Sequence, residues 1–272
     1  MDKIIAIANQ KGGVGKTTTT VNLSAALAAA GKKVLAVDID PQGNTTSGLG
    51  IDKDSIENSI YELLIDEATL DECIIKTDCE GLDIIPADVN LSGAEVELVD
   101  FENREFLLSK KLEEIRENYD FIIIDCPPSL TLLTLNAMTA ADAIIVPIQC
   151  EFYALEGLSQ LTQTIELVRD RLDKPELHIM GVVFTMYDAR TNLSLQVVQN
   201  VKKTLDQHVF KTIIPRNIRL AEAPSHGLPI NLYDKNCTGA ETYKRLAKEV
   251  IKLSKKSEKK EKNQPLDSRS EE

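Results

Sequence analysis

Short apolar runs alternate with longer amphipathic segments along the chain. The short runs are rich in Ile, Val and Leu, and several are apolar throughout, which is typical of strands that helices cover on both faces. The longer segments repeat apolar residues at helical spacing. The predicted strands are residues 4–8, 34–37, 82–85, 121–124, 143–146, 179–184 and 212–214, and the predicted helices are residues 17–30, 106–118, 154–173, 194–206 and 240–254.

This alternation of strand and helix determines the predicted fold class. Successive parallel strands joined by helices form right-handed crossovers, and their repetition gives a doubly wound α/β fold with a mostly parallel sheet flanked by helices. No linker interrupts the pattern before residue 254, so we expect a single domain over residues 1–254. Residues 255–272 consist mainly of Lys, Glu and Ser, with Leu266 as the one large aliphatic residue, and predict a disordered charged tail.

Apolar segments long enough for a membrane are missing from the sequence. The first apolar run covers only residues 4–8 and leads into a polar loop, so it indicates a strand and not a signal peptide. No stretch approaches the roughly 18–20 apolar residues of a membrane-spanning helix. The tail lacks the apolar face of a membrane-targeting helix. We therefore expect a cytoplasmic protein with no membrane partner.

Charge is distributed unevenly around a net value of −12. Residues 1–185 carry 14 Lys and Arg against 32 Asp and Glu, whereas residues 186–252 carry 11 against 6. The asymmetry indicates either a basic face on an acidic body or simply solvated Lys-rich helices. The five cysteines include no C-x-x-C pair, which argues against a zinc site or a disulfide framework.

The loop after the first predicted strand carries the strongest chemical signal. It reads Asn-Gln-Lys-Gly-Gly-Val-Gly-Lys-Thr-Thr over residues 9–18 and precedes an Ala-rich helix. Glycines let backbone N–H groups turn toward phosphate oxygens, and the helix N-terminus adds the positive end of its dipole. In such a loop Lys16 contacts the β- and γ-phosphates, and the Thr17 hydroxyl ligates Mg²⁺. The expected nucleotide-binding residues are Lys11, Gly12, Gly13, Val14, Gly15, Lys16, Thr17 and Thr18.

Carboxylates follow two of the predicted strands. Asp38 and Asp40 follow the predicted strand at residues 34–37, and Asp125 follows the predicted strand at residues 121–124. Ligands of open α/β sheets bind beyond the carboxyl ends of the strands, so these side chains are expected near the phosphates. Asp125 is the predicted Mg²⁺ ligand, directly or through water, and Asp38 is an alternative contributor to the Mg²⁺ shell.

The phosphate loop departs from the standard G-x-x-x-x-G-K-[ST] pattern. Gln10 stands where the first glycine belongs, and Lys11 is an additional lysine. The Lys-Gly-Gly-x-Gly-Lys-Thr form resembles the deviant P-loop of the ParA, MinD and nitrogenase iron-protein group. Similarity to the ParA/Soj family covers residues 3–252 and implies a ParA-type ATPase domain. It runs through Asp-Pro-Gln-Gly at residues 40–43, Asp-Cys-Pro-Pro at residues 125–128, and residues 149–157, 186–192 and 214–227.

This resemblance implies roles at the nucleotide for four of these residues. Lys11 is expected to cross the interface of an ATP-dependent homodimer and reach the nucleotide of the partner subunit. Asp40, which precedes Pro-Gln-Gly, is linked to hydrolysis in the family, where it either orients the attacking water or stabilises the loop that does so. Pro215 and Asn217 are expected to flank the adenine base. The expected catalytic residues are Lys11, Lys16, Asp40 and Asp125. Together they imply a magnesium-dependent ATPase with ATP and Mg²⁺ as its cofactors.

The resemblance also implies a DNA partner. Arg190 matches an arginine implicated in non-specific binding of double-stranded DNA, and Arg219 is a second expected contact. Non-specific binding requires only cations facing phosphates and weakens steeply with salt. The family further implies a ParB-type centromere-binding protein that stimulates hydrolysis, a nucleoid-associated location, and a role in partitioning a chromosome or plasmid.

Three other classes of protein share the P-loop with this family. A MinD-like cell-division positioning ATPase requires an amphipathic C-terminal helix, which the polar tail lacks. A nitrogenase-type iron protein requires cluster-bridging cysteines, and Cys126 and Cys150 do not carry that local pattern. A metabolic P-loop amidoligase of the dethiobiotin synthetase type shares the fold, but it does not explain the basic C-terminal third or the Asp-Ala-Arg-Thr-Asn run at residues 188–192.

Overall fold

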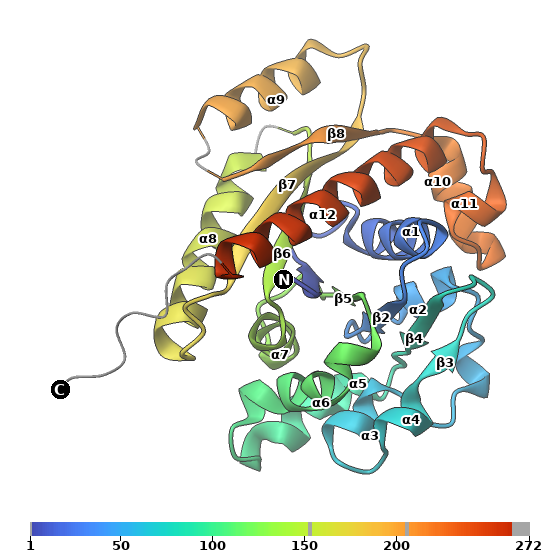
Figure 1. Cartoon of the computed structure of the whole chain (residues 1–272), viewed down its shortest axis with the longest axis vertical. Coiled ribbons are helices and arrows are strands. Elements are labelled where there is room, and N and C mark those ends of the chain that lie inside the picture. Colours follow the sequence, from blue (N-terminus) through green and yellow to red (C-terminus); the bar gives the residue numbers. More distant parts are fainter. Residues whose placement is uncertain (1, 152–153, 205–206, 263–272) are drawn as a thin grey trace.

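The computed structural model describes residues 2–151, 154–204 and 207–262. Strands and helices alternate along most of this part of the chain (Figure 1). The strands are β1 (Ile4–Ile7), β2 (Val34–Asp38), β3 (Ile75–Lys76), β4 (Leu82–Ile85), β5 (Phe121–Asp125), β6 (Ala143–Gln149), β7 (His178–Tyr187) and β8 (Val209–Pro215). The helices are α1 (Lys16–Ala29), α2 (Asn44–Gly48), α3 (Ile60–Leu64), α4 (Leu70–Cys73), α5 (Leu91–Glu97), α6 (Leu107–Ile115), α7 (Leu132–Ala140), α8 (Ala154–Arg171), α9 (Asn192–Thr204), α10 (Ile218–Glu222), α11 (Ile230–Tyr233) and α12 (Thr238–Lys262), with short 3-10 turns at residues 53–55, 98–100, 104–106, 116–118 and 223–226.

The strands form one sheet in the order β3-β4-β2-β5-β1-β6-β7-β8. Every neighbouring pair is parallel except β3 and β4. The chain runs from β1 outward to β4, returns to β5 beside β1, and then builds the other half through β6, β7 and β8. The order therefore reverses at the central strand β1, which is where open α/β sheets bind ligands. The predicted mostly parallel, doubly wound fold is confirmed.

Two hydrophobic clusters cover the two faces of the sheet. Alternate residues of β1 point to opposite sides, so Ile4 belongs to one cluster and Ile5 to the other. The first cluster packs the sheet against α3 to α9, and the second packs it against α1 and α10 to α12. Figure 1 shows α12 lying beside α1 and along β8. This double covering explains why the central strands are apolar throughout.

Several features differ from the sequence-based prediction. The short helices α2 to α5, α10 and α11 were not predicted, because four to seven residues are too few to show a helical repeat. The antiparallel edge strand β3 is only two residues long and has too little pattern to be recognised. Helix α7 was missed because it is apolar or small on nearly every side and has no polar face. Helix α12 continues to Lys262, so residues 255–262 are helical and not part of a disordered tail. Residues 263–272 of the predicted tail lie outside the described residues.

The helical extension has a local physical cause. Adding turns to a helix that is already packed avoids the cost of nucleation, and Lys and Glu are good helix formers. Two serines also attach this end of α12 to the start of the chain. The Ser254 hydroxyl donates to the Asp2 carbonyl at 2.7 Å, and the Ser257 hydroxyl donates to the Asp2 carboxylate at 2.9 Å. In the described residues, no helix combines the length and apolar composition needed to cross a bilayer.

Candidate nucleotide-binding site

The loop between β1 and α1 has the backbone conformation of an anion cradle. Gly13 and Gly15 have φ values of 74° and 88°, a left-handed conformation that glycine adopts without strain. A Cβ added at Gly12 or Gly13 would meet nothing within 4 Å, so these positions border open space. Gly15 is the N-cap of α1 and provides no side-chain cap. The first N–H groups of α1 therefore remain available to an anion, together with the positive end of the helix dipole.

A cavity of about 400 Å³ lies in front of this loop, and we call it the phosphate cavity. The loop and the first turn of α1 line one side of the cavity. Residues after β2, after β5 and at the end of β7 line the rest. The sequence-predicted residues Gly12, Gly13, Gly15, Lys16, Thr17, Thr18 and Asp40 all border it, together with Gln42, Asn44, Pro128 and Met186.

Lys16 lies at the base of the phosphate cavity. Its side chain is largely buried, and the Nζ atom donates to the Lys11 carbonyl at 3.1 Å. Burial lowers the pKa of the Lys16 ammonium, while the nearby Asp125 and Asp40 carboxylates oppose the shift. A cation in this position closes the loop on itself and retains N–H donors that can point toward phosphate oxygens.

The Lys11 side chain points away from the phosphate cavity. Its backbone N–H donates to Asn9 Oδ1 at 2.9 Å, and the Asn9 amide donates to the Pro147 carbonyl at 2.7 Å, which fastens the loop to β6. The Lys11 ammonium pairs with Glu151, with 2.5 Å between Nζ and Oε2. Lys11 is not among the residues that border the phosphate cavity of its own chain. Its side chain is 36% exposed, so the ammonium faces the outer surface.

Two carboxylates meet beneath the cavity where β2 and β5 run in register. Asp38 pairs with Asp125 across these strands, and both side chains are fully buried. Asp125 accepts hydrogen bonds from the hydroxyls of Thr20 at 3.1 Å and Thr45 at 2.7 Å. Asp38 accepts from the N–H and the hydroxyl of Thr46, each at 2.8 Å. Burial raises the pKa of both carboxyls, although the hydroxyl hydrogen bonds act in the opposite direction.

The oxygen donors around Asp125 fit a magnesium ion. Thr17 borders the phosphate cavity, and its side chain opposes the rise in the pKa of the Asp125 carboxyl, so a hydroxyl and a buried carboxylate lie close together beside the cavity. Mg²⁺ prefers such hard oxygen ligands and usually takes only one or two from the protein, with phosphates and waters supplying the rest. Across the described ranges, no three or more His, Cys, Asp and Glu side chains are grouped to hold a metal ion by themselves.

Asp40 differs from Asp38 in what it faces. Asp40 borders the phosphate cavity, and its Oδ1 accepts the N–H of Gln42 at 3.0 Å. The Asp40 N–H donates to Asp38 Oδ1 at 3.2 Å, so the buried Asp38 holds the turn that carries Asp40. Asp38 is the last residue of β2, and Asp40 follows the strand; of these two, only Asp40 borders the space where a phosphate or a water would lie.

A second cavity of about 230 Å³ adjoins the first. The two cavities share Gly15, Thr18 and Met186, so they form one continuous depression. Pro215 and Asn217, which the family resemblance implies flank the adenine, both border the second cavity. The Asn217 Oδ1 atom also caps α10 by accepting from the Arg219 N–H at 2.8 Å. The apolar walls of Ile214, Leu220 and Tyr243 would suit a flat aromatic base.

Residues that sequence reasoning missed complete this depression. Met186 borders both cavities and has a φ of 50°, which is uncommon for a residue with a side chain. The Thr185 hydroxyl donates to the Val14 carbonyl at 2.7 Å and attaches β7 to the phosphate loop. Thr45 and Glu151 contact predicted site residues from distant segments. A single sequence gives no signal for these contacts, because they depend on how separate strand ends meet.

The two predicted DNA-contacting arginines lie outside both cavities. Arg190 follows β7, and its side chain is 85% exposed. Its guanidinium makes two hydrogen bonds to Asp188, at 2.9 and 2.6 Å, and this pairing holds the pKa of the Asp188 carboxyl below its usual range. Arg219, in α10, pairs with Glu222 at 3.0 Å and lies 3.6 Å from Asp234. Both arginines are thus exposed but engaged with carboxylates of their own chain.

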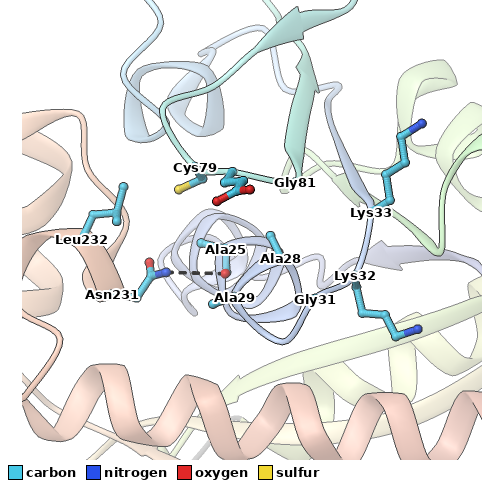
Figure 2. Close-up of a pocket in the computed structure, with 11 residues that line it drawn as sticks. Ala25, Ala28, Ala29, Gly31, Lys32, Lys33, Cys79, Gly81, Asn231 and Leu232 are labelled. Atoms are coloured by element: carbon cyan, nitrogen blue, oxygen red, sulfur yellow. Dashed lines mark hydrogen bonds between the residues drawn. The ribbon is translucent and has the colours of Figure 1, made fainter.

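A further cavity of about 600 Å³ lies at the other end of α1 (Figure 2). Its wall includes Ala25 and Ala28 of α1, and the Asn231 amide donates to the Ala25 carbonyl at 3.5 Å. Burial raises the pKa of the bordering Cys79 thiol to about 11, which keeps it protonated and unreactive. The cavity lacks the glycine loop and the carboxylates of the nucleotide site, so its chemistry is different.

Comparison with known proteins agrees with this geometry. A family model described as "AAA domain" matches residues 2–179. The chain is 60% identical over 250 residues to the sporulation initiation inhibitor protein Soj of Bacillus subtilis, covering 92% of this chain and 98% of that protein. It is 54% identical over 251 residues to the chromosome partitioning protein ParA of Caulobacter vibrioides, covering 92% and 94%.

A solved structure shares the fold as well. Cobyrinic acid a,c-diamide synthase from Mycobacterium smegmatis, with bound ADP and magnesium, superposes with a TM-score of 0.83 at 37% identity, over 94% of this chain and 97% of that one. Its identity to this chain is well below that of the Soj and ParA proteins named above. The phosphate loop, the carboxylates beyond β2 and β5, and these similarities together show that the chain belongs to the ParA/Soj family of chromosome-partitioning proteins.

Proposed function

We propose that this protein is a nucleotide-gated DNA-partitioning switch that binds ATP and Mg²⁺ and hydrolyses the ATP. The ATP-bound form closes into a homodimer that binds double-stranded DNA non-specifically, and hydrolysis then dissolves the dimer and releases the DNA. The observation that carries this proposal is the different placement of the two loop lysines. Lys16 borders the phosphate cavity, whereas Lys11 lies outside the cavity of its own chain and faces the surface.

Each residue of the nucleotide site has a distinct proposed role. The N–H groups of the loop from Lys11 to Thr18 cradle the phosphates, and Lys16 neutralises the β- and γ-phosphates. Thr17 and Asp125 hold Mg²⁺, which when bound offsets the negative charge of the phosphates. Pro215 and Asn217 flank the adenine in the adjoining cavity. The match to a structure that contains ADP and magnesium supports these assignments.

Hydrolysis is assigned to groups on both subunits. Asp40 borders the cavity with a carboxylate that accepts only one hydrogen bond in the described structure, from Gln42, so it can orient an attacking water. Lys11 of the partner subunit neutralises the charge that develops on the phosphates, as an arginine finger does. Lys11 must first leave Glu151, and a half-exposed ion pair of this kind contributes only about 1 kcal/mol or less.

DNA binding and release complete the proposed cycle. Arg190 from each subunit contacts the phosphate backbone, and Arg219 adds a second contact. Two weak sites on one rigid dimer bind far more tightly than either site alone, which makes binding depend on ATP. We infer a ParB-type partner that accelerates hydrolysis, and a cytoplasmic, nucleoid-associated protein, because the relatives are partitioning proteins.

An amidoligase is the principal alternative, because a diamide synthase shares the fold and the nucleotide site. The higher identity to Soj and ParA favours the partitioning role. An amidoligase would consume ATP only with an organic acid and an amide donor. ATP hydrolysis that needs no such substrates, and that rises with DNA and a ParB-type protein, would separate the two functions.

Sedimentation of the purified protein tests the proposed dimer. We expect a monomer without nucleotide or with ADP, and a dimer with ATP and Mg²⁺ when hydrolysis is slowed by Asp40→Ala. Adding Lys11→Ala should return the ATP-bound protein to a monomer that still binds ATP. A Lys11→Ala protein that dimerises as readily as its parent would remove Lys11 from the interface.

A further inference from the structure

A basic groove runs between the edge strand β8 and helix α12. α12 packs along β8, and two adjoining hollows of about 600 and 500 Å³ lie between them. Both hollows are bordered by Lys211 and Glu249, so they form one channel. We call this channel the β8–α12 groove. Its cationic residues are Lys211, Arg245, Lys248, Lys252, Lys255 and Lys256.

Glu249, the one carboxylate among the described residues that border the groove, is already engaged. Glu249 accepts the backbone N–H groups of Lys211 and Thr212, each at 2.9 Å, and the Thr212 hydroxyl at 2.5 Å. These N–H groups belong to an edge strand and face no further strand, so Glu249 satisfies donors that would otherwise lack partners. Its negative charge is therefore directed at the strand and away from the exposed lysines.

Most cations of the groove remain unpaired in the described part of the chain. Arg245 pairs with Glu241 at 3.2 Å, one helical turn earlier. No carboxylate among the described side chains lies within ion-pair distance of Lys248 or Lys252, and both lysines are exposed. This concentration of positive charge on a chain of net charge −12 provides a surface that attracts a partner of opposite sign.

The spacing of the cations follows one face of α12. Arg245, Lys248, Lys252 and Lys255 succeed one another at intervals of three or four residues, which places them in a row along the helix. Ten residues of helix span about 15 Å. The row is thus long enough to follow several phosphates of one DNA strand, which succeed one another every 3.4 Å or so along the duplex axis.

The groove also reaches the nucleotide site. Pro215 borders both the groove and the second nucleotide cavity. Within one turn of α12, Tyr243 faces the nucleotide cavity, and Thr242 and Arg245 face the groove. The same helix and strand end therefore support the nucleotide and carry the cations.

We propose that the β8–α12 groove is a docking surface for the sugar–phosphate backbone of duplex DNA, with Lys248 and Lys252 as principal contacts. This inference rests on the proposed function and extends its DNA surface well beyond Arg190 and Arg219. An anionic membrane is the less suitable partner, because stable attachment of a helix also requires exposed apolar side chains. The large exposed hydrophobic residues among those described all lie on other elements.

The test is a salt titration of duplex-DNA binding by Lys248→Gln/Lys252→Gln in the presence of ATP and Mg²⁺. The slope of log affinity against log salt should become shallower by about 1.8 for each subunit that contacts the duplex, since each phosphate contact contributes about 0.9. Affinity at 0.1 M salt should fall by tens of fold. The matched control is Lys76→Gln/Lys110→Gln, which removes two exposed lysines from β3 and α6 and should leave the slope unchanged.

Further variants and ligands distinguish a failure of the groove from a failure of the proposed function. Lys248→Arg/Lys252→Arg should restore the slope, and basal ATP hydrolysis and melting temperature should be the same in all variants. A wild-type slope in Lys248→Gln/Lys252→Gln would overturn the groove while leaving ATP-dependent DNA binding intact. No DNA binding by the wild-type protein would overturn the proposed function itself. The groove would be assigned to a membrane if the wild-type protein bound vesicles of anionic phospholipid, and if the Gln variant lost that binding while its DNA binding was unaltered.

Discussion

Replacing Lys16 with alanine should separate nucleotide binding from folding. The Lys16 ammonium is largely buried and makes one hydrogen bond, to the Lys11 carbonyl at 3.1 Å. Burial lowers its pKa, and a cation whose pKa is lowered by folding costs stability at neutral pH. The Lys16→Ala protein should therefore unfold at the same temperature as the wild type or slightly higher when no nucleotide is present.

The expected loss of ATP affinity is large by comparison. In the bound state Lys16 would make two charge-assisted hydrogen bonds, one to each of two phosphates, and each contributes about 1.5–3 kcal/mol. Their sum of about 3–6 kcal/mol corresponds to a 10²- to 10⁴-fold rise in Kd. Titration with a fluorescent ATP analogue measures Kd, and the shift in melting temperature on adding ATP provides a second readout.

Lys11→Ala is the matched control, because the two lysines share one loop and one charge. The Lys11 side chain pairs with Glu151 outside the phosphate cavity, so its removal should change the affinity of the monomer for ATP by no more than a few fold. A Lys16→Ala protein that binds ATP within threefold of the wild type would refute the assignment of the phosphate loop. Equal losses in both variants would refute the different placement of the two lysines.

Three other perturbations test separate parts of the structure. Asp40→Ala should retain ATP but slow phosphate release by about 100-fold or more, measured in single-turnover assays; unchanged turnover would assign hydrolysis to another group. Gly181→Ala would place a Cβ 2.6 Å from the buried Phe210 ring and should cost about 1–3 kcal/mol in urea unfolding. The hydrogen bond from His178 to Asp2 raises the pKa of the imidazole, so its stabilisation is complete below about pH 6.5 and disappears as pH rises through the raised value. His178→Gln should remove that part of the pH dependence, and an unaltered profile would contradict it.

The sequence predicted the central fold because that fold depends on local pattern. Strands such as β5 are apolar throughout because helices cover both faces, and the phosphate loop lies between a strand and a helix where its glycines can be recognised. Predicted strand ends fell short by a few residues, as in β7, which runs from His178 to Tyr187. Helix α7 was missed because burial on nearly all sides leaves no amphipathic pattern.

The remainder of the site could not be predicted because it consists of contacts between distant segments. The hydrogen bond from Thr45 to Asp125 joins residues that are 80 positions apart in the sequence. The ion pair between Lys11 and Glu151 joins residues that are 140 positions apart. The backbone conformation of Met186 at the junction of the two cavities is likewise set by the meeting of β7 with the loop. The charge asymmetry left a basic face and solvated Lys-rich helices as alternatives, and the position of the cations between β8 and α12 required the structure.

The most direct test of the proposed switch is duplex-DNA binding by the wild-type protein with ATP, with ADP and without nucleotide, at two salt concentrations. Arg190→Ala is measured beside it, with the exposed Arg171→Ala at the end of α8 as the matched control. The switch predicts salt-sensitive binding that requires ATP, is lost in Arg190→Ala and persists in Arg171→Ala. Binding of equal strength with all three nucleotide states, or ATP hydrolysis with no DNA binding at all, would contradict it.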